Sequence, residues 1–230
     1  MSDASAAKQA AGSAAADLVE SGMMLGLGTG STTACALEAL GVRIQKEALD
    51  VVGVPTSFAA ERLAHQYGIP LTTLDDTPRL DLALDGADEV DPQGRLIKGR
   101  GAAHTREKVV AHAAERFVVL IDPSKEVDTL GSQCPVPIEV VPMAVGPVQR
   151  LIGKLGGRPE LRMGQAKDGP VITDQALWII DAHFDGIEDP EALSRTLNDH
   201  PGILDHGLFL GMATDVICGE ADGNVTHTRP

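Results

Sequence analysis

The first half of the chain alternates between helix-like and strand-like hydrophobic patterns. The spacing predicts a helix over 6–20 that stops at Gly22, and a second helix that opens at 29–32 and runs through Leu40. Short apolar runs predict strands at 23–27, 51–54, 70–74, 80–84 and 117–121. Strands separated by helices are typical of an α/β fold, so we expect a doubly wound, mostly parallel, Rossmann-like sheet.

The second half has a different order of elements. It reads as strand 136–141, helix 144–155, strands near 160–163 and 177–181, helix 190–198 and strand 203–209. This βαββαβ order predicts a smaller α+β domain of the ferredoxin-like kind. A last strand at 213–217 can return to the first sheet. We therefore expect a Rossmann-like domain of residues 1–131 plus 207–230, with residues 132–206 inserted into it.

Composition limits the partners of the protein. The formal net charge of -14 repels nucleic acid and anionic lipid, and no Lys/Arg-rich run interrupts it, so neither partner is expected. The three cysteines are widely spaced without a CxxC pair, which predicts inert thiols rather than a disulfide framework or a zinc site. With no signal-peptide pattern and no long apolar run, we expect a cytoplasmic protein, and the acidity is compatible with a saline cytoplasm.

A glycine-rich turn at 26–32 (Gly-Leu-Gly-Thr-Gly-Ser-Thr) joins a predicted strand to a predicted helix. Backbone N–H groups at such a helix start suit a phosphate, although a purely structural tight turn explains the pattern equally well. A nicotinamide cofactor is disfavoured, because Ser31 occupies the third glycine position and 55–57 lacks the ribose-binding acid. A Walker motif is also absent, since no lysine precedes the Ser-Thr pair.

Two further segments carry candidate chemistry. Asp85 and Asp88 follow the apolar run 80–84, where they can orient sugar hydroxyls, act as acid or base, bind a cation, or simply form a solvated turn. Lys98 lies in a glycine segment before a helix that begins near Thr105, and can stabilise an oxyanion. Glu107, in the first turn of that helix, is a candidate base if it is desolvated, or else part of an exposed helix face.

Taken in order, these segments resemble type A ribose-5-phosphate isomerase over nearly the whole chain. The matching pieces are 26–32, 85–89, 98–103, 105–108, Asp-Pro-Ser-Lys at 122–125, Glu-Val-Val-Pro-Met at 139–143, Lys-Leu-Gly-Gly-Arg-Pro-Glu at 154–160, 201–203 and 207–209. The resemblance implies interconversion of D-ribose 5-phosphate and D-ribulose 5-phosphate in the pentose phosphate pathway, without a metal or an organic cofactor. It also implies a homodimer or a homotetramer.

The resemblance assigns roles to individual residues. Glu107 becomes the proton shuttle of an ene-diolate mechanism, Lys98 stabilises the oxyanion, and Asp85 assists ring opening. The residues that it implies for substrate binding are Thr29, Gly30, Ser31, Thr32, Asp85, Gly86, Ala87, Asp88, Lys98, Gly99, Arg100, Gly101, Lys125 and Lys8.

One position departs from the family pattern, and two other functions stay open. Arg100 replaces a glycine of the usual triple glycine after the lysine, so either its backbone dihedrals are ordinary or the local loop differs from that of the family. We expect the arginine to be tolerated, with a side chain that points outward or toward the phosphate. A noncatalytic sugar-phosphate sensor would need the phosphate loop but neither Lys98 nor Glu107. An amino-sugar phosphate isomerase or a lactonase would differ in its substrate.

Overall fold

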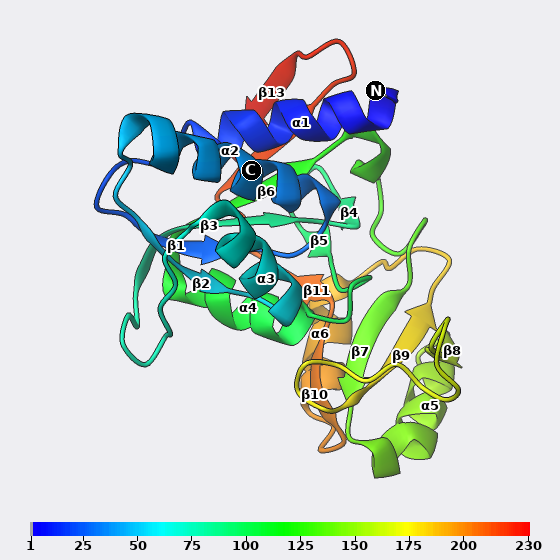
Figure 1. Ribbon diagram of the computed structural model, residues 1–230. Coiled ribbons are helices and arrows are strands. Elements are labelled where there is room, and N and C mark those ends of the chain that lie inside the picture. The colour runs from blue at the N-terminus through cyan, green and yellow to red at the C-terminus, as the bar shows by residue number, and fades with distance from the viewer. Residues whose placement is uncertain (1) are drawn as a thin grey trace. The chain divides into compact units, whose positions relative to one another are not determined.

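A computed structural model describes residues 2–230, and the chain divides into two compact units (Figure 1). Unit 1 comprises the described residues up to Ala87, with Arg106–Glu126 and Met212–Pro230. Unit 2 comprises Asp88–Thr105 and Val127–Gly211. The domain division expected from the sequence, 1–131 plus 207–230 and 132–206, stays a prediction.

Unit 1 contains a six-stranded sheet in the order β13-β12-β6-β3-β1-β2. The strands from β2 to β12 pair in parallel, and β13 is antiparallel to β12. The predicted doubly wound, mostly parallel sheet is therefore confirmed, as is the return of the chain near 213–217. The strands are β1 Met24–Leu27, β2 Val52–Pro55, β3 Leu80–Gly86, β6 Ala114–Ile121, β12 Asp215–Gly219 and β13 Val225–Thr228.

Helices cover both faces of this sheet because its central strands are apolar on both sides. The face formed by Leu25, Leu27 and Leu84 belongs to one core with residues of α1, α2 and α3. On the other face Val110 of α4 packs against Gly26. Figure 1 shows α4 across the sheet from α1. The helices are α1 Asp3–Ala16, α2 Ser31–Glu47, α3 Phe58–Tyr67, α4 His104–Ala113 and the short 3₁₀ helix η1 Pro123–Lys125.

Several predicted elements of unit 1 differ from the structure. The predicted strand 70–74 is wrong, because Leu71 forms only an isolated bridge with Gly53 and Thr73 then closes a turn through its hydrogen bond to Asp76. The first helix ends at Ala16, and the second continues past Leu40. Strand β13 was not predicted.

Unit 2 contains a four-stranded antiparallel sheet in the order β10-β7-β9-β8. Its elements follow one another in the chain as β7, α5, β8, β9, α6 and β10, which confirms the predicted ferredoxin-like unit. Their bounds are β7 Val136–Val140, α5 Val145–Lys154 after the 3₁₀ helix η2 Pro142–Ala144, β8 Arg158–Leu161, β9 Trp178–His183, α6 Pro190–Asn198 and β10 Ile203–His206. A smaller sheet joins β11 Leu208–Phe209, β5 Leu96–Ile97 and β4 Glu89–Val90.

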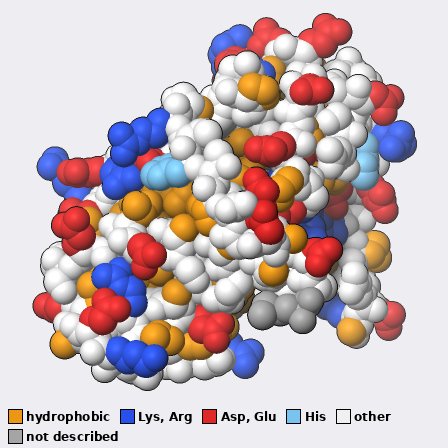
Figure 2. Space-filling view, turned by 90° about the horizontal axis from the view of Figure 1, so that it is seen from above, with side chains coloured by type: hydrophobic (Ala, Val, Ile, Leu, Met, Phe, Trp, Pro, Cys, Tyr) orange, Lys and Arg blue, Asp and Glu red, His pale blue; other side chains and the backbone are white. Residues whose placement is uncertain are grey.

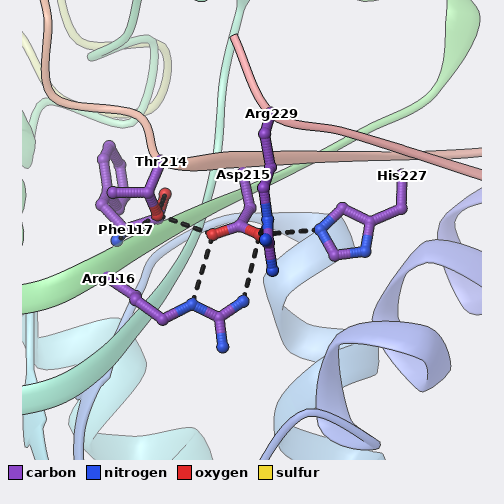
Figure 3. Close-up of polar contacts among 6 residues, drawn as sticks. All are labelled: Arg116, Phe117, Thr214, Asp215, His227 and Arg229. Carbon is purple, nitrogen blue, oxygen red and sulfur yellow. Dashed lines mark hydrogen bonds and ion pairs between the residues drawn. The ribbon is translucent and has the colours of Figure 1, made fainter.

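A buried carboxylate connects the strands at one edge of the unit 1 sheet through hydrogen bonds (Figure 3). Asp215, at the start of β12, accepts hydrogen bonds from the side chains of Arg116, Thr214, His227 and Arg229. Burial alone would raise the pKa of Asp215, but these hydrogen bonds outweigh it and hold the pKa well below its usual range. The contacts link β6, β12 and the C-terminal hairpin strand.

Replacing Asp215 by asparagine is expected to lower the free energy of unfolding at pH 7 by about 2 kcal/mol, because charge-assisted hydrogen bonds are lost. A carboxyl with a lowered folded-state pKa stabilises above its unfolded pKa of about 3.9 and loses this contribution as the pH falls below that value. The difference from wild type should therefore shrink by about 1 kcal/mol at pH 3, as measured by denaturant unfolding. Equal losses of unfolding free energy at pH 7 and at pH 3 would contradict this expectation. The control is Asp17→Asn, the same change at an exposed position.

Candidate active site

The candidate residues of unit 1 follow the carboxyl ends of neighbouring parallel strands. Strands β1 and β3 lie side by side in the sheet, and the neighbours of this pair are β2 on one side and β6 on the other. The chain therefore reverses its winding between β1 and β3. Open α/β sheets bind ligands outside the carboxyl ends of strands at such a switch point. The segments 28–32 and 85–87 begin there.

The structure brings the glycine-rich turn and Asp85 together. The Thr29 N–H donates to Oδ1 of Asp85 at 3.0 Å, and the Gly86 N–H donates to the same oxygen at 2.8 Å. A Cβ atom at Gly28 would lie 2.4 Å from Cγ of Asp85, so only glycine permits this approach. Asp85 is 2% exposed, which excludes a solvated turn at this position.

The turn leads into a helix start that suits an anion. Gly30 is the N-cap of α2 with φ of 122°, and neither a side-chain cap nor an acidic residue occurs in the first turn. Ser31 and Thr32 occupy that turn. Backbone N–H groups and the helix dipole at such an end attract negative charge.

A hydroxyl cluster beside this turn was missed by the sequence reasoning. The Thr29 hydroxyl lies 2.8 Å from that of Thr56 and 2.7 Å from that of Ser57. Both partners are buried, and Ser57 also caps α3 by accepting from the Ala60 N–H at 3.0 Å. The available signal was their position directly after the strand β2.

Two predicted cations lie at the same edge of the sheet. Lys125 is in η1, directly after β6, where Asp122 caps the turn by accepting from the Ser124 N–H at 3.0 Å. Lys8 is half-buried on α1. The neighbouring turn of α1 lies against Gly219, the last residue of β12. Because β12 and β6 are parallel, both lysines lie near carboxyl strand ends.

Glu107 lies on the buried face of α4. His104, Glu107, Val110 and Ala111 are buried and follow the helical repeat, whereas Val109 is 53% exposed. Glu107 itself is 4% exposed. The alternative that this glutamate belongs to a solvated helix face is therefore wrong, and its carboxylate meets the desolvation condition for a base.

Lys98 occupies a buried position in unit 2. It is 2% exposed, its N–H donates to the Gly207 carbonyl at 2.9 Å, and its ammonium lies 5.4 Å from the centroid of the Phe209 ring. A Cβ atom at Gly207 would lie 2.1 Å from the Lys98 carbonyl oxygen, so the two backbones approach closely. A buried ammonium is a strong electrostatic group because water does not screen it.

The loop after Lys98 holds Asp88. The Arg100 N–H donates to Oδ2 of Asp88 at 3.0 Å, and Nε of Arg100 lies 3.8 Å from Oδ1. Positive φ angles occur at Gly99 (108°) and Ala102 (58°) but not at Arg100. Of the two alternatives for the backbone of Arg100, the structure therefore has the ordinary dihedrals. Its side chain is 78% exposed and points outward, which is one of the two directions expected. A pocket of about 280 Å³ opens beside it, lined in part by Asp88, Arg100 and Cys134.

Replacing Arg100 by glycine is accordingly expected to change kcat less than about threefold, because the contacts of this residue with Asp88 and Arg162 that hold the loop come from its backbone N–H and C=O, which glycine retains. Steady-state kinetics on ribose 5-phosphate, the substrate that the resemblance implies, would measure this. A sharp rise in kcat would mean that the arginine distorts the loop.

A buried glutamate that the sequence reasoning gave no role fixes the start of α4. Glu139 of β7 is 2% exposed and accepts hydrogen bonds from the hydroxyls of Thr105 and Thr173. Thr105 is the second residue of α4. The pairing therefore anchors, within unit 2, the first turn of the helix that carries Glu107.

Other features of the described residues concern metal binding, membrane spanning and thiol chemistry. Among residues 2–230, no group of three or more His, Cys, Asp or Glu side chains is placed to hold a metal ion, and no helix is long and apolar enough to cross a membrane. Burial raises the pKa of Cys218 to about 11, which makes this thiol unreactive. On the face shown in Figure 2, acidic side chains are spread widely, with Lys and Arg in small groups among them.

Comparison with known proteins agrees with this geometry. The model of the family ribose 5-phosphate isomerase A (phosphoriboisomerase A) matches residues 52–223. Ribose-5-phosphate isomerase A of Thermosynechococcus vestitus is 57% identical over 93% of this chain and 91% of its own, and that of Haloarcula marismortui is 52% identical over 97% and 96%. The ribose 5-phosphate isomerase A structure from Methanocaldococcus jannaschii has a TM-score of 0.93 at 44% identity, covering 97% of this chain and 98% of its own. A D-ribose-5-phosphate isomerase structure in complex with phospho-erythronic acid has a TM-score of 0.96 at 43% identity, with all of both chains covered. The chain therefore belongs to the ribose-5-phosphate isomerase A family.

Proposed function

We propose that this protein interconverts D-ribose 5-phosphate and D-ribulose 5-phosphate through an ene-diolate, with Glu107 as the proton shuttle. As a member of its family the protein is an aldose–ketose isomerase of the pentose phosphate pathway. The observation that carries the mechanism is the buried carboxylate of Glu107, on a helix whose first turn is anchored by Glu139.

The chemistry needs a base, an oxyanion stabiliser and no external oxidant. After ring opening assisted by Asp85, the Glu107 carboxylate takes the C2 proton, and the C2 electron pair forms a C1–C2 double bond while the carbonyl oxygen becomes an oxyanion. The ammonium of Lys98 and nearby N–H groups stabilise that charge. Glu107 then returns the proton to C1, the 2-hydroxyl proton moves to O1, and the ketose results with all atoms and electrons balanced.

The remaining candidate residues divide between the two ends of the substrate. The α2 start at 29–32, with Lys8 and Lys125, would hold the phosphate. Asp85–Asp88 and Lys98–Gly101 would contact the sugar. The complex of a relative with phospho-erythronic acid, a phosphorylated sugar acid, favours such a ligand. We further propose that the protein works without a cofactor, in the cytoplasm, as a homodimer or homotetramer.

An assay of ribose 5-phosphate turnover in the presence of a chelator tests this proposal. Formation of ribulose 5-phosphate at an undiminished rate is the expected result. Amino-sugar phosphates and sugar lactones offered in parallel should not be turned over. Binding of ribose 5-phosphate without turnover would favour the sensor alternative, and loss of activity with the chelator would require a metal.

A further inference from the structure

Arg162 contacts the loop that follows Lys98. It lies directly after β8, and its Nη1 donates to the carbonyl oxygens of Gly99 and Arg100, at 3.0 Å each. Its side chain is only 17% exposed. The carbonyls of two successive peptides in the candidate oxyanion loop therefore share one half-buried cationic donor.

These two contacts determine where the loop's N–H groups point. In a planar trans peptide the C=O and N–H groups lie on opposite sides. Because Arg162 binds the Gly99 carbonyl, the Arg100 N–H of the same peptide points away from Arg162. This N–H donates to Asp88 at 3.0 Å. An Arg100 carbonyl held by Arg162 likewise turns the Gly101 N–H away from Arg162. The guanidinium thus fixes the directions of two amides: that of Arg100, which donates to Asp88, and that of Gly101, which the proposed mechanism places at the substrate.

Asp181 holds the guanidinium in this position. Its carboxylate accepts from Nε of Arg162 at 2.8 Å and from Nη2 at 2.5 Å. Asp181 lies on β9, and the Arg162 N–H donates to the Ile179 carbonyl of the same strand at 2.9 Å. Only a planar fork can bind a carboxylate on one edge and two carbonyls on the other, so lysine cannot replace it.

We infer that Arg162, held by Asp181, is a positioning residue for isomerisation: it holds the 99–101 loop so that the Arg100 N–H binds Asp88 and the Gly101 N–H is oriented to stabilise the oxyanion. The inference rests on the proposed function. It predicts that loss of Arg162 weakens binding of the transition state more than binding of the substrate, because the Gly101 N–H meets full negative charge only as the ene-diolate forms.

Steady-state kinetics of Arg162→Met test the inference. The expected result is a fall in kcat of at least about tenfold with KM changed less than about threefold, and partial recovery of kcat on adding guanidinium ion. Inhibition by phospho-erythronic acid should weaken in parallel. Arg158→Met, at an exposed arginine that begins β8, the strand directly before Arg162, is the matched control and should behave as wild type. An unchanged kcat, or a rise in KM alone, would overturn the inference.

A second variant, Arg162→Lys, tests the inference even if Arg162→Met does not fold. It keeps the charge but loses the fork, so kcat should fall at least about threefold without a change in melting temperature. Wild-type kcat in Arg162→Lys would overturn the inference. Failure of the proposed function is distinguishable, because it would appear as an inactive wild-type enzyme, whereas failure of the inference leaves wild type active and the Arg162 variants equally active.

Discussion

Replacing Glu107 by glutamine is expected to lower kcat for ribose 5-phosphate by at least about 100-fold while the protein stays folded. The amide keeps the shape and the hydrogen-bonding capacity of the side chain but cannot accept the C2 proton. Glu107 is 4% exposed, so bulk water cannot easily substitute as the base. KM should change little, because the carboxylate acts on a proton that moves only in the transition state.

Hydrogen exchange separates a chemical role for Glu107 from a structural one. In D₂O the wild-type enzyme should incorporate deuterium at the carbon that receives the proton, and Glu107→Gln should do so at least about 100-fold more slowly. Glu115→Gln, the same change at an exposed position, is the control and should be unaffected. Near-normal turnover in Glu107→Gln would remove this residue from the mechanism.

Much of the fold was predictable because the hydrophobic pattern of a segment agrees with the place of that segment in the folded core. The run 80–84 is apolar and becomes β3, a central strand whose carboxyl end delivers Asp85. The segment 70–74 (Pro-Leu-Thr-Thr-Leu) was also predicted to be a strand, yet Pro70 lacks an N–H to donate and Thr73 bonds to Asp76 instead of extending the pairing. Hydrophobicity alone therefore marks where a strand can form, whereas local turn chemistry decides whether it does.

The candidate site was predictable where its residues lie in short segments of the sequence. It was not predictable where it depends on contacts between residues that are far apart in the sequence. Gly28 could be recognised beside a strand end, and the structure shows its close approach to Asp85. Arg162 contacts the carbonyl oxygens of residues 99 and 100, and backbone carbonyls carry no sequence signature. The Glu139 pairing with Thr105 spans 34 positions and was equally hidden.

Replacing Lys98 by methionine is expected to lower kcat by about 100-fold to 1000-fold, since one lost oxyanion donor commonly costs about 3 to 4 kcal/mol in the transition state. Methionine preserves the unbranched stem and removes the ammonium, whose nitrogen lies 5.4 Å from the centroid of the Phe209 ring. The proton acceptor at position 107 remains, so residual turnover should still exchange hydrogen with solvent. This distinguishes the variant from Glu107→Gln.

The burial of Lys98 makes the expected effect large. At 2% exposure its charge is little screened, and each of the other groups that would stabilise the oxyanion is a neutral amide. Lys154→Met, at an exposed position of the same unit, removes the same charge from the surface and should leave kcat unchanged. If Lys98→Met raised KM and left kcat intact, the ammonium would serve substrate binding alone. The oxyanion would then depend on the backbone amides of the 99–101 loop, and the effect of Arg162→Met on kcat should exceed that of Lys98→Met.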